Sequence, residues 1–189
     1  MEIGTHLAST LKSLRQQRGW SLDRASEATG VSKAMLGQIE RGESSPTLAT
    51  LWKIATGFNT SFSGLLTVPA SGLKEPLFVL GSQQQADLPD EQLQVRPLFP
   101  FDARFGFELI ELTLPPHTEH ASEPHEDGVV EHVTVSAGTL EVLIDGHWHP
   151  LNTGDAVRFA ADAAHGYRNV CDAPATFHNL IHYPAGTRA

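Results

Sequence analysis

Apolar side chains recur at helical spacing through the first 66 residues. Leu7, Leu11 and Leu14 stand at i, i+4 and i+7, which is one face of a helix, and Gly19 ends that helix. Three further helical segments each begin after residues that favour helix N-termini, namely Ser21, Ser32 and Ser45–Thr47. The pattern therefore predicts four short helices, followed by a fifth short piece that ends near residue 66.

The third predicted helix, from Lys33 to Arg41, has two unlike faces. Leu36 and Ile39 point into the bundle. The opposite face carries small or polar residues: Ala34, Gly37, Gln38 and Arg41. A glycine within a helix costs about 1 kcal/mol relative to alanine, so Gly37 indicates a backbone that must come close to another group. The three-residue turn at 30–32 matches the DNA-binding helix-turn-helix pattern. A helical bundle that binds other proteins is the alternative interpretation.

From about residue 96 the apolar period changes to two, as in half-buried strands. Strands are predicted at 107–114, 131–135, 139–144, 156–159 and 176–183, with glycine-containing turns between several of them. Many short strands at regular spacing indicate an all-β sandwich or barrel. Residues 67–95 are polar and rich in turn-forming residues, and we expect a linker there with one short strand at Leu77–Leu80.

Composition excludes several classes of protein. The 189 residues contain a single cysteine, Cys171, which excludes a disulfide framework and a cysteine-based zinc finger. No apolar run approaches the roughly 18 residues of a membrane span, and the start of the chain lacks the pattern of a signal peptide. We therefore expect a cytoplasmic protein with no membrane partner.

Charge divides the chain into two unlike parts. Residues 1–66 hold seven basic and five acidic side chains, a net charge of +2, whereas residues 67–189 hold six basic and 17 acidic ones, a net charge of −11. Nine of the ten histidines also lie in the second part. The first part can approach phosphates, while the second repels DNA and concentrates residue types that bind metals.

The run GVSKAMLGQIERGESSPTLATLWKIATGF closely resembles the helix-turn-helix of phage-repressor-like regulators of the xenobiotic-response-element family. This resemblance implies that Lys33, Ala34 and Gln38 contact bases. Gln38 could bind an adenine through two hydrogen bonds, and Lys33 could reach a guanine or a phosphate. The resemblance also implies a buried ion pair between Arg15 and Glu40.

The same resemblance implies contacts with the DNA backbone. The predicted helix from Lys33 to Arg41, which would contact the bases, is called the reading helix. Backbone contacts are expected from side chains around it: Ser21, Arg41, Ser45 and Thr47, with Ser32 and Gly37 in the same DNA-binding surface. One such domain makes few phosphate contacts. We therefore expect a homodimer that binds two half-sites about 34 Å apart on a near-palindromic, double-stranded DNA operator.

The run GVVEHVTVSAGTLEVLIDGHWHPLNTGDAVRFAADAAHGYRN closely resembles the double-stranded β-helix of cupins, a small jelly roll. The fold class expected is therefore two-domain. An all-α, lambda-repressor-like helix-turn-helix occupies residues 1–66, a linker occupies 67–95, and an all-β cupin domain for sensing and dimerisation occupies 96–189.

The two cupin motifs are incomplete in this sequence. The first places His125 and Glu131 at ligand positions, with Asp127 where a second histidine is usual. The second motif places His165 at its ligand position. Two imidazoles and a carboxylate suit one divalent metal ion of the zinc or iron class, and Asp127 is a possible fourth ligand. The alternative is that these residues are remnants and bind no metal.

The resemblance implies a transcriptional regulator whose barrel senses a small-molecule effector. An anionic effector would require a cation, for which Arg104, Arg158 and Arg168 are the candidates. On the last strand either His178 or Asn179 points inward, and we favour His178. Two alternatives remain open: an oxygenase-like cupin metalloenzyme joined to a DNA-binding domain, and a regulator whose cupin only dimerises. We expect a regulator without enzymatic activity.

Overall fold

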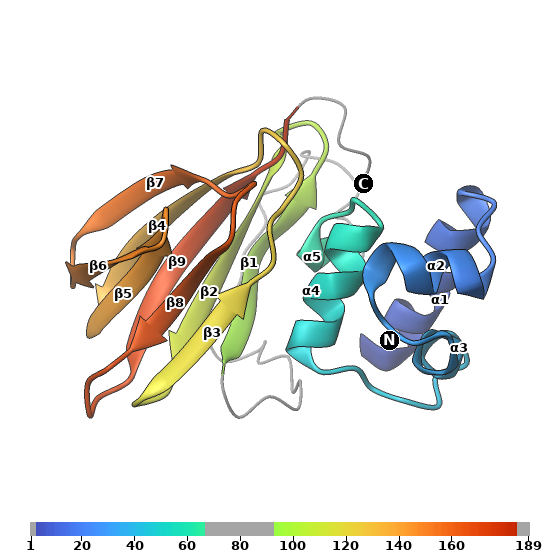
Figure 1. The fold of residues 1–189 in the computed structure, drawn as a ribbon, viewed down its shortest axis with the longest axis horizontal. Helices are drawn as coiled ribbons and strands as arrows, with labels where there is room; N and C mark the ends of the chain where they lie inside the picture. The colour runs from blue at the N-terminus through green and yellow to red at the C-terminus, as the bar shows by residue number, and fades with distance from the viewer. Residues whose placement is uncertain (1–2, 67–92, 185–189) are drawn as a thin grey trace, which may run out of the picture.

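The structure, a computed structural model, describes residues 3–66 and 93–184 (Figure 1). The expected strand at Leu77–Leu80 and most of the expected linker lie outside these residues. Helices come first and strands second, as the sequence predicts. The helices are α1 (Ile3–Gln17), α2 (Leu22–Thr29), α3 (Lys33–Glu40), α4 (Leu48–Gly57) and α5 (Phe62–Leu66). None of the described helices is long and apolar enough to cross a membrane.

Three helices begin at the residues that the sequence indicates. The hydroxyl oxygens of Ser21, Ser32 and Thr47 each accept a hydrogen bond from the backbone N–H three residues later, at 3.1, 3.3 and 3.3 Å. Such caps satisfy backbone donors that have no partner within the helix. Helix α2 ends at Gly30, whose φ of +66° lies in the left-handed region that favours glycine.

The helical core forms where the apolar stripes meet. Leu7 and Leu11 of α1 are buried, as are Leu36 and Ile39 of α3. Helix α4 crosses α2 at close range because Gly57 has no side chain: a Cβ there would lie 2.5 Å from the carbonyl oxygen of residue 28. These contacts hold the turn between α2 and α3 in a fixed geometry.

The expected ion pair between α1 and α3 is present. The Arg15 guanidinium donates two hydrogen bonds to the Glu40 carboxylate, at 2.6 and 2.8 Å, and a third to the carbonyl oxygen of Trp20 at 2.9 Å. The Arg15 and Glu40 side chains are only 17% and 8% exposed. Arg15 therefore positions the reading helix on the bundle and does not face DNA.

Replacing Glu40 with glutamine should lower the free energy of unfolding by about 2 kcal/mol, because it breaks a charge-assisted, largely buried pair. Thermal unfolding followed by circular dichroism measures this change. Glu27→Gln is the matched control, since it breaks the exposed pair between Arg24 and Glu27 and should shift the transition little. Equal shifts for the two variants would contradict a structural role for Arg15.

Nine described strands follow the helices and form two sheets. They are β1 (Gln94–Asp102), β2 (Phe107–Leu114), β3 (Thr118–Ser122), β4 (Val130–Ala137), β5 (Thr139–Ile144), β6 (His147–Asn152), β7 (Ala156–Ala160), β8 (His165–Asn169) and β9 (Ala175–His182). One sheet has the order β1-β2-β9-β4-β7 and the other β3-β8-β5-β6, with every pairing antiparallel. The expected all-β cupin barrel is present, and its first strand begins at Gln94, inside the expected linker.

Burial alternates along the strands and decides which side chains enter the barrel. On β9, Phe177, Asn179 and Ile181 are buried, so the residues between them face outward. The prediction that His178 points inward is therefore wrong. The His178 imidazole pairs on the outer face with Glu111 of β2, at 3.2 Å. Period-two geometry allows only one of two neighbours to face inward, and the register of β9 selects Asn179.

The two parts of the chain are joined by hydrogen bonds at helix α5, which with α4 lies between the strands and the other helices (Figure 1). The buried Glu108 carboxylate on β2 accepts hydrogen bonds from the backbone N–H groups of Phe62 and Ser63, at 3.1 and 2.7 Å, and from the hydroxyl of Tyr183. The Ser63 hydroxyl in turn accepts from the backbone N–H of Phe101 on β1, at 2.7 Å. The first turn of α5 is thus fixed to both strands.

Candidate functional site

The expected base-reading residues lie on one open face of α3. Lys33, Ala34 and Gln38 are exposed, while Leu36 and Ile39 on the opposite face are buried. The Lys33 ammonium lies 2.8 Å from the Asp23 carboxylate, and both side chains are more than half exposed. An exposed pair of this kind is weak, so Lys33 remains free to exchange Asp23 for a phosphate or base.

Gly37 does not belong to that open face. It is buried, and a Cβ there would lie 3.2 Å from a guanidinium nitrogen of Arg41 and 3.7 Å from the Leu22 side chain. The prediction that its backbone approaches DNA is therefore corrected. The missing side chain makes room for Leu22 of α2 and for Arg41, and so serves packing within the helix-turn-helix.

The residues expected at the DNA backbone surround this face. Ser21, Ser32, Ser45 and Thr47 are exposed, and the hydroxyls that cap helices can still donate to a phosphate. The Arg41 guanidinium makes hydrogen bonds of 2.6 and 2.8 Å with the neighbouring Glu43 carboxylate, and both side chains are more than half exposed. Phosphates would compete with Glu43 for Arg41.

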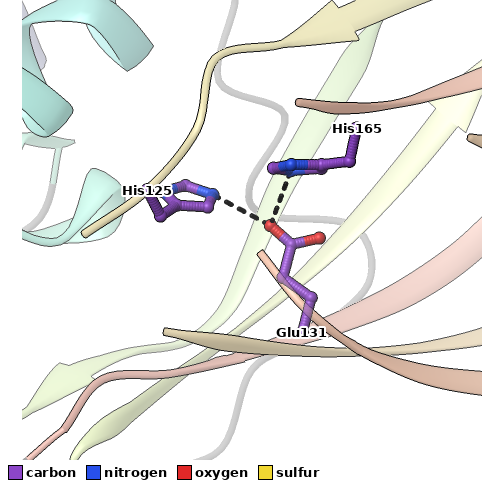
Figure 2. A group of neighbouring side chains, drawn as sticks. All are labelled: His125, Glu131 and His165. Atoms are coloured by element: carbon purple, nitrogen blue, oxygen red, sulfur yellow. Dashed lines mark hydrogen bonds and ion pairs between the residues drawn. The ribbon is translucent and has the colours of Figure 1, made fainter. Parts of the chain in front are cut away.

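The second candidate site lies inside the barrel, where three side chains point toward one another (Figure 2). His125 comes from the loop between β3 and β4, Glu131 from β4 and His165 from the start of β8. The Nε2 atoms of the two histidines lie 3.0 and 3.4 Å from the same oxygen, Glu131 Oε1. All three side chains are at least 90% buried.

The Glu131 carboxylate is oriented by its other oxygen. Oε2 accepts hydrogen bonds from the Tyr167 hydroxyl and, at 2.9 Å, from the side-chain amide of Asn179. Burial alone would raise the pKa of Glu131, but the hydrogen bond from His125 and the interaction with His165 lower that pKa below its ordinary value. Glu131 is therefore an anion that directs one oxygen toward the two imidazoles.

His165 is held in a defined orientation by the backbone. Its Nδ1 lies 2.9 Å from the carbonyl oxygen of Ala163, and because a carbonyl only accepts, Nδ1 carries the proton. Nε2 then holds a lone pair when the ring is neutral. This atom is buried and makes no described hydrogen bond, but it lies 3.4 Å from Glu131 Oε1, with which it forms an ion pair when the ring is protonated. Burial lowers the pKa of His165, but Glu131 and the Ala163 carbonyl raise it overall.

The cluster fits a metal ion in its donor types and spacing. One nitrogen from each histidine and one oxygen of Glu131 all lie within 4.8 Å of one another. Bonds of about 2.0–2.2 Å to zinc place the ligands of one ion roughly 3 to 4 Å apart, so small side-chain movements complete the set. The Ala163 carbonyl supplies the outer hydrogen bond that metal-bound histidines usually make. Two imidazoles and one carboxylate match zinc or ferrous iron.

Asp127 is not a member of this cluster, and its prediction as a fourth ligand is corrected. It is exposed in a turn closed by a hydrogen bond from the Val129 N–H to the Glu126 carbonyl, at 3.1 Å. That turn carries residue 127 away from the barrel. Three of the four predicted ligands therefore come together.

None of the three predicted arginines faces the interior of the barrel. Arg104 is exposed and pairs with Asp102 at the end of β1. Arg158 is exposed on β7, next to the inward-facing Phe159. Arg168 pairs with Glu141 on the outer face and lies over the Trp148 ring, 4.1 Å from its centre. The register of each strand places these side chains outside, and the prediction that they bind an effector is corrected.

A cavity of about 60 Å³ lies beside the cluster, and it reaches helix α4. Its wall includes Trp52 and Lys53 of α4 as well as His125, Glu131 and Asn179 of the barrel. Sequence reasoning missed the two helical residues because Trp52 falls on the apolar stripe of α4 and reads as ordinary core. No local signal shows that this stripe meets the barrel.

Comparisons with known proteins agree with the division of the chain into a helix-turn-helix and a cupin barrel. A helix-turn-helix family model matches residues 11–65, and a cupin-domain model matches residues 110–182. The chain is 53% identical over 182 residues to the HTH-type transcriptional regulator SutR of Escherichia coli, covering 96% of this chain and 97% of that one. A crystal structure of an HTH_3 family transcriptional regulator from Vibrio cholerae matches with a TM-score of 0.80 and 42% identity, covering 96% and 97% of the two chains.

The chain belongs to the family of HTH-type transcriptional regulators with a cupin domain. The HTH-type transcriptional regulator PuuR of Escherichia coli is 24% identical over 159 residues, covering 84% of this chain and 85% of PuuR. The prediction of a regulator in place of a metalloenzyme is confirmed by this membership. The regulator binds DNA through its helix-turn-helix, so the alternative of a helical module that only binds proteins no longer applies.

Replacing Gln38 with alanine should cost about 1–3 kcal/mol at one base position of the operator, or about 5- to 150-fold in affinity. The reason is that an exposed glutamine on the reading helix can make two hydrogen bonds to one adenine. Competition binding with duplexes that differ at single base pairs measures the effect, and Gln17→Ala on α1 is the matched control. An equal loss on every sequence would place Gln38 against the DNA backbone.

Proposed function

We propose that the barrel of this regulator binds one divalent metal ion, of the zinc or iron class, through His125, Glu131 and His165, and that a small-molecule effector is sensed at this centre. The observation that carries the proposal is the Nε2 atom of His165. It is buried, makes no described hydrogen bond and lies 3.4 Å from Glu131 Oε1, so a neutral His165 ring directs an unshared lone pair toward the carboxylate. A buried nitrogen of this kind is costly unless it is bound, and a metal ion would satisfy it.

We also propose that the regulator acts as a homodimer on a near-palindromic operator. One helix-turn-helix presents a single short reading helix with few cations around it, and two such domains would double both the base and the phosphate contacts. Binding of metal and effector would change the operator affinity by altering how the two reading helices are held. For this, the effector needs only to bind more tightly to one arrangement of the two reading helices than to another, and no chemical reaction is required.

Metal content tests the proposed centre. Purified full-length regulator, loaded with zinc and freed of excess ion, should contain close to one equivalent per chain by elemental analysis. The His165→Ala variant should lose it because the lone-pair nitrogen is removed. His178→Ala is the matched control and should retain the metal, since His178 lies on the outer face of β9, the strand next to that of Glu131.

Two results would contradict the proposal. Wild-type regulator that stays free of metal after loading with zinc and, under anaerobic conditions, with ferrous iron would make the three residues a purely structural cluster. Equal metal in wild type and His165→Ala would place the ion elsewhere on the chain.

A further inference from the structure

The cavity beside the proposed metal centre is shared between the two domains. Helix α4 of the DNA-binding domain contributes Trp52 and Lys53 to its wall, and the barrel contributes His125 and Glu131. A molecule in this cavity would therefore contact the DNA-binding domain directly.

Trp52 stands between the barrel and helix α5. Its ring is stacked on Phe62, 4.3 Å between ring centres, and meets the His125 ring edge-on at 5.8 Å. The indole Nε1 is buried and has no hydrogen-bond partner among the described residues. Buried indole N–H groups usually have an acceptor, so this donor indicates a missing one.

The barrel supplies a second buried atom of this kind. The side-chain amide nitrogen of Asn179 donates hydrogen bonds to Glu131 and to the Tyr167 hydroxyl oxygen, at 2.9 and 3.2 Å, while its Oδ1 has no described partner. Asn179 and Trp52 both line the cavity. The cavity is thus lined by one residue with an unpaired donor, on α4, and by one residue with an unpaired acceptor, in the barrel, which fits a ligand that can both accept and donate hydrogen bonds.

Charge in the cavity favours an anion. Lys53 and Glu123 both line the wall and their charges cancel, but no acidic group of the described residues lies within ion-pair distance of the Lys53 ammonium. If the proposed dication is bound by two neutral imidazoles and the Glu131 carboxylate, the centre carries a net charge of +1. A monoanion would neutralise this charge and would also attract Lys53.

The size of the cavity limits the ligand. One water molecule occupies about 10–15 Å³ of such a cavity, so the space of about 60 Å³ accommodates roughly four to six non-hydrogen atoms. Small carboxylates with an additional hydroxyl group combine this size with one negative charge, two acceptor oxygens and one donor.

We propose that the effector is a small carboxylate bound between the domains, with the Trp52 indole and the Lys53 ammonium of α4 as direct ligands of its oxygens. This inference rests on the proposed sensing function and specifies both its ligand class and its route to DNA. The bound anion ties α4 to the barrel. Because α4 packs closely on α2 through Gly57, the position of the helix-turn-helix relative to the barrel follows the occupancy of the cavity.

Direct titration tests this site in the full-length regulator. Acetate, glycolate and lactate are titrated into zinc-loaded and metal-free protein by calorimetry, with glycolamide as the neutral counterpart of glycolate. At least one of the three carboxylates should bind, and glycolamide should bind at least tenfold more weakly than that carboxylate. Lys53→Gln and Trp52→Phe should each weaken carboxylate binding about tenfold. Their matched controls, Lys12→Gln on α1 and Trp148→Phe on β6, should bind as the wild type does.

Tryptophan fluorescence gives a second, independent signal. Carboxylate binding should change the emission of the wild type and of Trp148→Phe, and the change should be absent in Trp52→Phe. Circular dichroism shows whether each variant keeps its helices, so that unfolding is not mistaken for lost binding.

The results separate this inference from the proposed metal centre. Metal bound but none of the three carboxylates bound would overturn the inference and leave the metal centre standing. Carboxylate binding that is lost in Lys53→Gln, in a protein that takes up no metal, would support the inference and contradict the metal centre. Binding that is unchanged in both Lys53→Gln and Trp52→Phe would remove α4 from the site and overturn the inference.

Discussion

Raising the sodium chloride concentration from about 50 to about 200 mM should weaken operator binding by the full-length regulator about a thousandfold. The reason is that residues 1–66 carry a net charge of +2 while the rest of the chain carries −11, so attraction to DNA is confined to the reading domains. In the proposed homodimer, two such domains that neutralise about six phosphates would give a decline of this size through the release of condensed counterions.

The measurement is fluorescence anisotropy of a labelled operator, selected from random duplexes, at four salt concentrations. The slope of log affinity against log salt should be about −5. Arg41→Gln should make it less steep by about two in a dimer, because the exposed Arg41 guanidinium is free to exchange Glu43 for a phosphate. A flat salt response would contradict the assigned DNA-binding surface.

Replacing Glu108 with alanine should lower the free energy of unfolding by about 3 kcal/mol. The substitution leaves two buried backbone N–H groups, at Phe62 and Ser63, and the Tyr183 hydroxyl without their acceptor, and each unsatisfied group costs about 1–3 kcal/mol before relaxation. Chemical denaturation measures the loss. Glu111→Ala is the matched control on the same strand, because Glu111 faces outward and pairs with Arg96 and His178.

The loss in Glu108→Ala should also depend on pH. Burial raises the pKa of Glu108, against the opposing effect of its hydrogen bonds from Ser63, Tyr183 and Phe62. A carboxyl whose folded-state pKa is raised stabilises the fold most at low pH, and this contribution is lost as the pH rises through the folded-state pKa. The difference between wild type and Glu108→Ala should therefore be larger at pH 5 than at pH 8. The opposite trend would show that the ionised form is favoured on folding.

Local sequence signals predicted the helical half well because they act within a few residues. Ser21, Ser32 and Thr47 cap helices as their side chains dictate, and the glycines that follow α1 and α2 adopt the left-handed conformation. The five strands predicted after residue 96 are present, but four other described strands were missed. Strands β3, β6 and β8 have few apolar residues and no clear alternation, and β1 contains two prolines, which an edge strand tolerates because one side has no neighbour.

The barrel site was predictable only where motif spacing fixes it. The spacing of the two cupin motifs identified His125, Glu131 and His165, which the fold brings together. The errors concern residues whose direction depends on strand register or on a turn, such as Asp127 and His178. The sequence could not have shown that Trp52 and Lys53 of α4 line the cavity, because their place there depends on how one domain packs against the other.

Operator affinity with the barrel filled and emptied of metal tests the central claim most directly. Wild-type regulator is compared in its zinc-loaded form and after removal of zinc by a chelator, at one salt concentration, beside His165→Ala treated in the same way. If the barrel controls the DNA-binding domain, the two wild-type forms should differ about 5- to 150-fold in operator affinity, and His165→Ala should show one affinity throughout. Equal affinity of the two wild-type forms, with zinc binding verified, would contradict the account.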